Sequence, residues 1–171
     1  MIRKQLNHFQ TLEKMPILNT DCVLFLCSIS SENLGLIMRS ADIFGISHIY
    51  YLKDKYSLQD EYISKISRNS TIPIISASGF EELVNLKEDG YTLGALEITD
   101  TSIPLRQVAF SNKLCLIVGN EQHGIPENIL ETADFSCHIE MTGGRISSLN
   151  VSIATSIALY EVSQYLLKQV R

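Results

Sequence analysis

Three short segments of the 171-residue chain hold the residue types and spacing that chemistry on a phosphate-bearing substrate needs. In the first, Asn33 and Arg39 bracket a helical pattern of apolar residues that ends at Gly45. A guanidinium binds a phosphate through two parallel hydrogen bonds, so Arg39 is a candidate phosphate contact. The alternative is an exposed Arg39 paired with Asp42, three residues later on the same helix. Gly35 disfavours a helix by roughly 1 kcal/mol relative to Ala, which indicates that another backbone or a ligand approaches it closely.

The second segment follows the apolar run 114–118 and reads GNEQHGIP over residues 119–126. Its two glycines permit positive φ, and the exposed backbone amides of such a loop bind anions or polar ligands. Glu121 then lies at a strand exit, where its carboxylate can enter a cleft. The alternative is an ordinary turn from a strand to a helix. His123 is expected to be exposed to solvent.

The third segment covers residues 139–154 and leads from a strand through a loop into the last helix. Ser147 or Ser148 is the predicted N-cap. Asn150 and Ser152 then fall in the first turn, beside backbone N–H groups that have no partner within the helix. This predicts a polar pocket rich in donors. The alternative is a helix cap followed by a packing face of small residues.

The elements that position these segments alternate between strands and helices along the chain. The predicted strands cover residues 23–27, 48–52, 73–76, 91–96, 114–118 and 135–139. The predicted helices cover residues 33–44, 60–68, 80–87, 126–131 and 148–169. Asn33 and Ser78 are the expected N-caps of the first and third helices, and Pro126 the first residue of the fourth. The alternation predicts an α/β fold with a mostly parallel sheet flanked by helices, whose ligands lie beyond the carboxyl ends of the strands.

Composition restricts the class of protein further. The chain has 14 Lys and Arg against 19 Asp and Glu, a net charge of −5. This excludes a strongly basic nucleic-acid coat, whose pI would exceed about 9. The length predicts one domain over residues 21–171 after a short N-terminal extension, residues 1–20. No membrane span and no signal peptide are expected.

The cysteine pattern predicts free thiols and no metal site. The four cysteines form no C-x-x-C pair, and they fall mainly in apolar, strand-like runs, where cysteine behaves as a small hydrophobic residue. We therefore expect a reducing, cytoplasmic setting. These residues are Cys22, Cys27, Cys115 and Cys137.

Taken together, the three segments resemble the SpoU (TrmH-type) family of RNA ribose methyltransferases, in the SPOUT superfamily. The first matches the family pattern N-x-G-x-I-x-R-x-A-x-x-F-G at every fixed position. The second matches an apolar strand followed by G-N-E-x-x-G-I, and the third matches I-x-M followed by S-L-N-V-S-x-A. The resemblance runs from Asn33 to Ala154 in the family's order.

The resemblance implies a fold, an activity and partners. The implied activity is transfer of a methyl group from S-adenosylmethionine to a ribose 2′-hydroxyl of tRNA or rRNA, without a metal. The implied fold is the α/β sheet with a C-terminal trefoil knot, within a single SPOUT methyltransferase domain. Family members are homodimers, with an active site built from both subunits.

The resemblance also implies catalytic roles. Arg39 matches the arginine that engages the target phosphate and helps to deprotonate the 2′-hydroxyl, and Asn33 matches the residue that orients it. Glu121 matches the acid of the second motif. Ser148 and Asn150 match polar residues of the third motif, near the cofactor and the catalytic arginine.

The cofactor residues implied in the same way come from three loops. Ile139 and Met141 match the loop beside the adenine, and Leu96 is assigned by position only. The full cofactor set is Leu96, Gly119, Ile139, Met141, Ser148 and Leu149. Glu140 replaces the family's usual proline, and the loop from Met141 to Asn150 is one residue longer than usual. Either Ser147 or Ser148 is therefore the motif serine, and altered cofactor affinity is expected.

The candidate RNA contacts are four cations: Arg39, Lys65, Arg68 and Arg145. The alternative for Arg145 is a solvated loop residue. The choice between tRNA and rRNA stays open. Two rival functions also stay open: a knotted RNA-binding or assembly protein without catalysis, and methyl transfer to a base.

Overall fold

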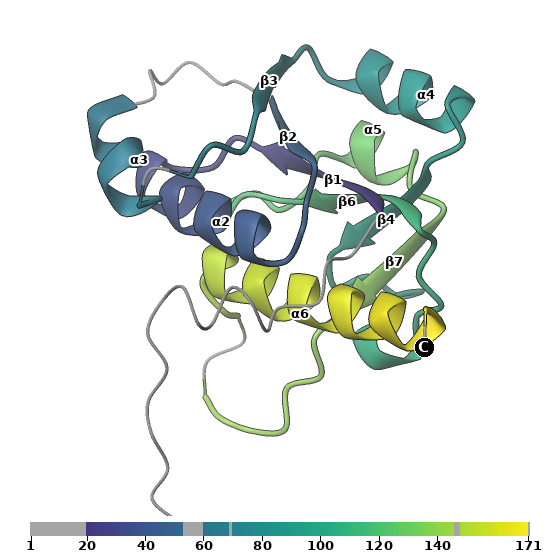
Figure 1. The fold of residues 1–171 in the computed structure, drawn as a ribbon. Helices are drawn as coiled ribbons and strands as arrows, with labels where there is room; N and C mark the ends of the chain where they lie inside the picture. The colour runs from purple at the N-terminus through teal and green to yellow at the C-terminus, as the bar shows by residue number, and fades with distance from the viewer. Residues whose placement is uncertain (1–19, 53–59, 69, 146–147, 171) are drawn as a thin grey trace, which may run out of the picture.

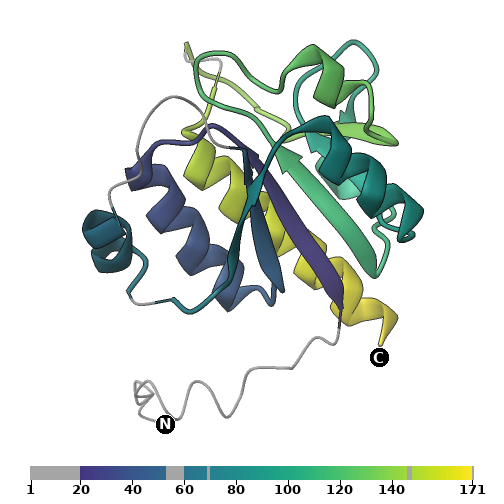
Figure 2. The ribbon, with the colours of Figure 1, turned by 90° about the horizontal axis from the view of Figure 1, so that it is seen from above.

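A seven-stranded parallel sheet with helices on both faces forms the molecule (Figures 1 and 2). The computed structural model describes residues 20–52, 60–68, 70–145 and 148–170. The strand order is β3-β2-β1-β6-β4-β7-β5, and every strand pair is parallel. The predicted α/β class with a parallel sheet is therefore confirmed. The strands are β1 (Asp21–Cys27), β2 (His48–Leu52), β3 (Ile74–Ala77), β4 (Thr92–Leu96), β5 (Ile103–Pro104), β6 (Lys113–Val118) and β7 (Phe135–His138).

Two hydrophobic cores hold the helices on the sheet. Along β1, Leu24 and Leu26 point into the core shared with α2 and α6, whereas Val23 and Phe25 point into the core shared with α4 and α5. This alternation follows from the period of two in a strand, and burial on both faces explains the continuous apolar sequence. The helices are α2 (Ser31–Ile43), α3 (Asp60–Ile66), α4 (Phe80–Glu88), the 3-10 helix η1 (Leu105–Gln107), α5 (Glu127–Leu130) and α6 (Val151–Gln169). The four cysteines are buried and free, as predicted.

The N-caps of the two helices that carry site residues differ from the prediction. Helix α2 begins at Ser31, and the Ser30 side chain caps it by accepting the Asn33 backbone N–H at 3.3 Å. The prediction of Asn33 as the N-cap is therefore wrong, and the Asn33 side chain is available for other contacts. Helix α6 is capped by Asn150, whose Oδ1 accepts the Ser152 N–H at 2.9 Å.

The predicted serine cap of α6 is therefore also wrong. Ser148 precedes the helix, and Ser147 lies outside the described residues. Several polar residues in succession can each cap a helix, and asparagine is among the best. The path of the loop into α6, which sequence alone does not give, decides between them.

Smaller differences have local causes. Gly79, not Ser78, is the N-cap of α4, because the Glu82 carboxylate accepts the backbone N–H groups of both residues at 2.9 Å. Those bonds, led by the one from Ser78, hold the pKa of Glu82 below its ordinary value. Pro126 is the N-cap of α5 and not its first residue. Helix α3 ends at Ile66, two residues before Arg68, which adopts a positive φ of 58°.

Gly35 marks the contact between α2 and α3. A Cβ atom at this position would lie 2.9 Å from Ile66 Cβ and 3.2 Å from the Ile63 carbonyl oxygen. The close approach predicted from the helical glycine is therefore a neighbouring helix. None of the helices in the described part of the chain has the length and apolar character that a membrane crossing requires.

We predict that Gly35→Ala lowers the free energy of unfolding by about 1 kcal/mol or more, although the substitution favours an isolated helix by a similar amount. The added methyl group meets Ile66 at its Cβ, which cannot rotate away. Urea unfolding followed by circular dichroism measures the change. Gly143→Ala is the control, since a Cβ there would meet nothing within 4 Å. An increase in stability for Gly35→Ala would contradict the proposed packing.

Candidate active site

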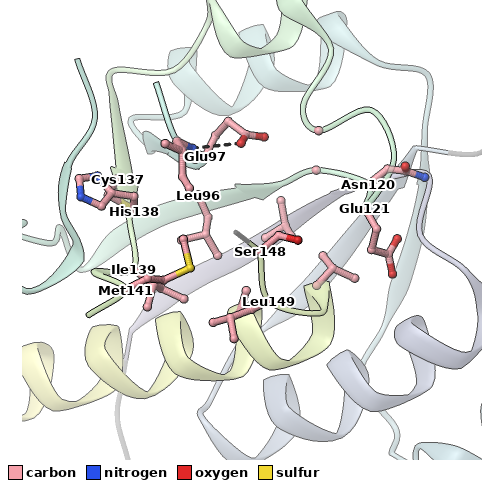
Figure 3. A pocket seen from close by; sticks show the side chains of 16 residues that line it. Leu96, Glu97, Asn120, Glu121, Cys137, His138, Ile139, Met141, Ser148 and Leu149 are labelled. Atoms are coloured by element: carbon pink, nitrogen blue, oxygen red, sulfur yellow. Dashed lines mark hydrogen bonds between the residues drawn. The ribbon is translucent and has the colours of Figure 1, made fainter. Parts of the chain in front are cut away.

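A pocket of about 270 Å³ opens at the carboxyl ends of β4, β6 and β7, beside the start of α6 (Figure 3). This is the edge where ligands bind in open parallel sheets. Six residues that the sequence pattern assigned to a cofactor site come from separate loops, and all of them line this pocket: Leu96, Gly119, Ile139, Met141, Ser148 and Leu149.

The wall of the pocket is largely apolar. Met141 and Leu149 are 45% and 40% exposed, unusually high for large apolar side chains, and both border the pocket. Leu96 and Ile139 continue this surface (Figure 3). A concave apolar wall with a few polar groups at its edge is typical of a small-molecule site.

The loop after β6 is held in a tight turn that requires glycine. A Cβ atom on Gly119 would lie 2.6 Å from the Ile125 nitrogen and would also meet the carbonyl carbon of Gly124. Asn120 and Gly124 exchange two backbone hydrogen bonds, at 3.0 and 2.8 Å, and Gly124 has a positive φ of 66°. The turn leaves Gly119, Asn120 and Glu121 at the pocket.

Three of the predicted catalytic residues form one hydrogen-bonded chain. The Asn33 side-chain amide donates to Glu121 Oε1, and the Asn150 amide donates to Asn33 Oδ1 at 3.0 Å. Asn150 Oδ1 in turn accepts the Ser152 hydroxyl at 2.6 Å. Asn33 is only 8% exposed, whereas Glu121 is exposed at the pocket, and Glu121 Oε2 has no partner among the described residues. The chain therefore orients a carboxylate that can still accept a hydrogen bond.

Asn120 links the loop after β6 to the loop after β1. The sequence analysis did not single it out. Its amide donates to the Ser28 carbonyl at 2.8 Å, and its Oδ1 accepts the Gln122 N–H at 2.7 Å. Ser28 follows β1 with a positive φ of 52°, and the Tyr51 hydroxyl donates to the Ile29 carbonyl at 2.8 Å. These bonds fix the turn that leads into α2 and hence the position of its first turn. The sequence signal that could have identified Asn120 is its position directly after Gly119, at the end of a predicted strand.

Arg39 is exposed on α2 and does not line the pocket. It follows Gly35 by four residues and therefore lies on the row of α2 nearest α3. The alternative pairing with Asp42 is wrong, since the ion pair found in the described part of the chain joins Lys87 and Asp134 at 2.8 Å. The structure thus leaves this guanidinium free for an outside ligand.

The other predicted RNA contacts are also exposed. Lys65 lies on α3 and Arg68 just after it, close in sequence to the α3 residues that contact α2. Arg145 lies in the loop before α6, away from any described ion pair. His123 is exposed, as expected.

Besides Asn120, the sequence analysis missed two other polar side chains at the pocket. Glu97 follows β4 and lines the pocket, and His138 Nδ1 lies 3.0 Å from the Ser102 hydroxyl. Cys137 also borders the pocket, but burial raises its pKa to about 12, so its thiol stays protonated and is a poor nucleophile at neutral pH. Within the described residues, no group of three or more His, Cys, Asp or Glu side chains is arranged to hold a metal ion.

Comparison with known sequences gives a family match over most of the chain. The model of the SpoU rRNA Methylase family matches residues 21–160. A tRNA (guanosine(18)-2'-O)-methyltransferase of Aquifex aeolicus is 31% identical over 147 residues, which cover 84% of this chain and 69% of that protein. The Escherichia coli protein of the same name is 26% identical over 134 residues, with 78% of this chain and 58% of that protein covered. The chain spans between 53% and 73% of the length of such relatives.

Comparison with solved structures agrees with this family match. An AdoMet-bound rRNA methyltransferase of Sinorhizobium meliloti superposes with a TM-score of 0.78 at 28% identity, covering 85% of this chain and 57% of that one. A TrmH/SpoU tRNA modifying enzyme of Aquifex aeolicus gives a TM-score of 0.75 at 27% identity, covering 89% and 78%.

We predict that Asn33→Asp destabilises the protein by about 2 kcal/mol at pH 8 and by clearly less at pH 4.5. The substitution removes the donor to Glu121 and places a second carboxyl group against it. Repulsion raises the pKa of the introduced carboxyl, so the loss is complete above that pKa and is relieved as the pH falls through it. Urea unfolding at the two pH values measures this, with the exposed Asn128→Asp as the control. An equal loss at both pH values would contradict the contact.

Proposed function

This chain belongs to the SpoU rRNA methylase family, and we propose that it transfers a methyl group from S-adenosylmethionine to a ribose 2′-hydroxyl of RNA. One observation carries the proposal. Residues from the ends of β4, β6 and β7 and from the start of α6 meet in one pocket, directly beside the Asn33–Glu121–Asn150 chain. The relatives named as tRNA 2'-O-methyltransferases support the same reaction.

The residues at the pocket fit this cofactor. Leu96, Ile139, Met141 and Leu149 offer an apolar surface that would suit the flat adenine, and Gly119 lines the same pocket without a side chain to fill it. The charged side chains that line the pocket are acidic, which suits a sulfonium cation. The AdoMet-bound relative has the same fold.

The protein's own part in the reaction is positioning and handling of a proton. Bound S-adenosylmethionine supplies an activated methyl group, and the ribose hydroxyl is a weak nucleophile that must lose a proton. Arg39 binds the adjoining phosphate with its guanidinium, and its positive charge stabilises the alkoxide that forms when the hydroxyl proton passes to solvent water. Glu121 is held by Asn33, which Asn150 holds in turn, and together with Ser148 at the pocket it would orient the acceptor toward the methyl group.

A homodimer completes this site. Arg39 does not line the pocket of its own chain, so the proposed chemistry needs a second copy or a substrate that spans the gap. Helices α2 and α6 are neighbours, since the Ser40 and Ser156 hydroxyl groups lie 2.7 Å apart. Their outer faces therefore form one surface on which a second copy could pack. The exposed apolar residues on these two helices are Leu36, Ile43, Ile153 and Tyr160.

Three further features belong to the same proposal. The C-terminal part of the sheet forms the family's trefoil knot, supported by the insertion of β6 between β1 and β4. Residues 21–171 form one domain, supported by the family match over 21–160. A cytoplasmic location is supported by the four free cysteines.

We predict that Arg39→Ala lowers methyl transfer by at least about 100-fold while cofactor affinity changes less than about 2-fold. The guanidinium acts on the substrate phosphate and not on the pocket. Calorimetry measures cofactor binding, and mapping of 2′-O-methylation in total RNA, with and without the protein, measures transfer and identifies the acceptor. Lys168→Ala, at the exposed end of α6, is the control.

The outcomes separate the rival functions. A methylated base in digested RNA would contradict ribose transfer. A wild-type protein that binds no cofactor would support the non-catalytic RNA-binding alternative. Loss of folding in Arg39→Ala would assign that residue a structural role.

We predict that Arg39→Ala and Glu121→Ala, each inactive alone, recover roughly a quarter of wild-type activity when co-expressed. Random pairing makes half of the dimers mixed, and each mixed dimer holds one intact site out of two. Activity of all the co-expressed protein, purified through one tag that both variants carry, measures the recovery. No recovery in a complex shown to be dimeric by sedimentation would place all catalytic residues of a site in one chain.

A further inference from the structure

Glu97 is fixed in place by two loops of the pocket. It follows β4 directly and is half-buried. Its Oε1 accepts the Ile98 backbone N–H at 3.0 Å, and its Oε2 accepts the Ile125 N–H at 3.2 Å (Figure 3 shows the former). Gly124 leaves room for the carboxylate, since a Cβ there would lie 2.7 Å from Oε2. The side chain is therefore held by backbone groups on both sides of the pocket's edge.

The charges at the pocket are unbalanced. The lining residues include two carboxylates, Glu97 and Glu121, and no Lys or Arg among the described positions. Figure 3 shows the two acidic side chains on different sides of the pocket, with Leu96 and Ser148 nearer its centre. Glu121 Oε1 is already bonded to the Asn33 amide, as part of the catalytic chain. The carboxylate of Glu97 meets backbone donors and no opposite charge.

The excess of negative charge at the pocket allows it to distinguish the cofactor from its product, which have nearly the same shape. S-adenosylmethionine carries a sulfonium charge, and the demethylated product carries a neutral thioether in its place. A fixed negative charge in a partly exposed pocket favours the cation by roughly 3- to 10-fold in affinity. A shape-based pocket would bind both alike.

We propose that Glu97 is a specificity-determining residue that makes the pocket prefer the sulfonium cofactor to its thioether product. The inference rests on the proposed function, because it takes the methyl donor as the ligand. Glu97 lies outside all three sequence motifs, so the motifs assign it no role. Its consequence is faster exchange of product for fresh cofactor.

Calorimetry on the full chain tests the inference with three probes: S-adenosylmethionine, its demethylated product, and an analogue with an amine in place of the sulfonium. We predict that Glu97→Gln weakens binding of the two cationic probes roughly 3- to 10-fold and changes product binding less than about 2-fold. The selective loss should shrink in high salt, because added ions screen the wild-type charge. Glu88→Gln, at the far end of α4, removes the same charge away from the pocket and is the control.

The outcomes are distinct. Equal weakening for all three probes would overturn the inference, because it would mean that Glu97 only braces the two loops; the proposed function would stand. Should Glu97→Gln fail to fold, the salt dependence of the three affinities in the wild-type protein decides. A ratio of cation to product affinity that does not change with salt would again overturn the inference. A wild-type protein that binds none of the probes would overturn the proposed function together with it.

Discussion

The side chain of Asn33 makes the contacts on which the candidate active site depends. It lies buried between the loop after β6 and the start of α6, donating to Glu121 and accepting from Asn150. A buried amide with one unmatched group costs about 1–3 kcal/mol, so both neighbours are required. An amide meets this demand because it presents a donor and an acceptor a short distance apart. The three motifs are thus one hydrogen-bonded unit, although they lie far apart in sequence.

The strand order brings these segments together. β1, β6 and β4 are adjacent and parallel, so the loops that follow them leave the same edge of the sheet. Asn120 fastens the loops after β1 and β6 to one another, and Glu97 fastens the loops after β4 and β6. Each link uses a side chain of one loop and a backbone group of the next. These links fix the loops of the pocket relative to one another.

Sequence reasoning predicted the class of fold, and its errors in the helix caps were local. Strand runs such as Leu114–Val118 and the three motifs are strong signals, and the residues assigned from them do meet in one pocket or hydrogen-bonded chain, with Arg39 the exception. The caps failed because Ser30, Asn33 and Asn150 are all competent caps, and only the path of the incoming loop selects one. Strand β5 and η1 are too short to show a period. Glu97 and Asn120 were missed because their roles depend on backbone groups, whose positions a sequence does not reveal.

The net charge of −5 and an RNA substrate are compatible if binding is local. Proteins that hold RNA by many phosphate contacts need a basic surface and bind less tightly as salt rises. Here the exposed cations Arg39, Lys65 and Arg68 lie on or just beyond α2 and α3, while acidic groups line the cofactor pocket. The two charge requirements of the reaction conflict, because a phosphate needs cations and a sulfonium needs anions. Under the proposed function, placing Arg39 and the acidic groups on different elements resolves this conflict, and it accounts for the position of Arg39 outside the pocket of its own chain.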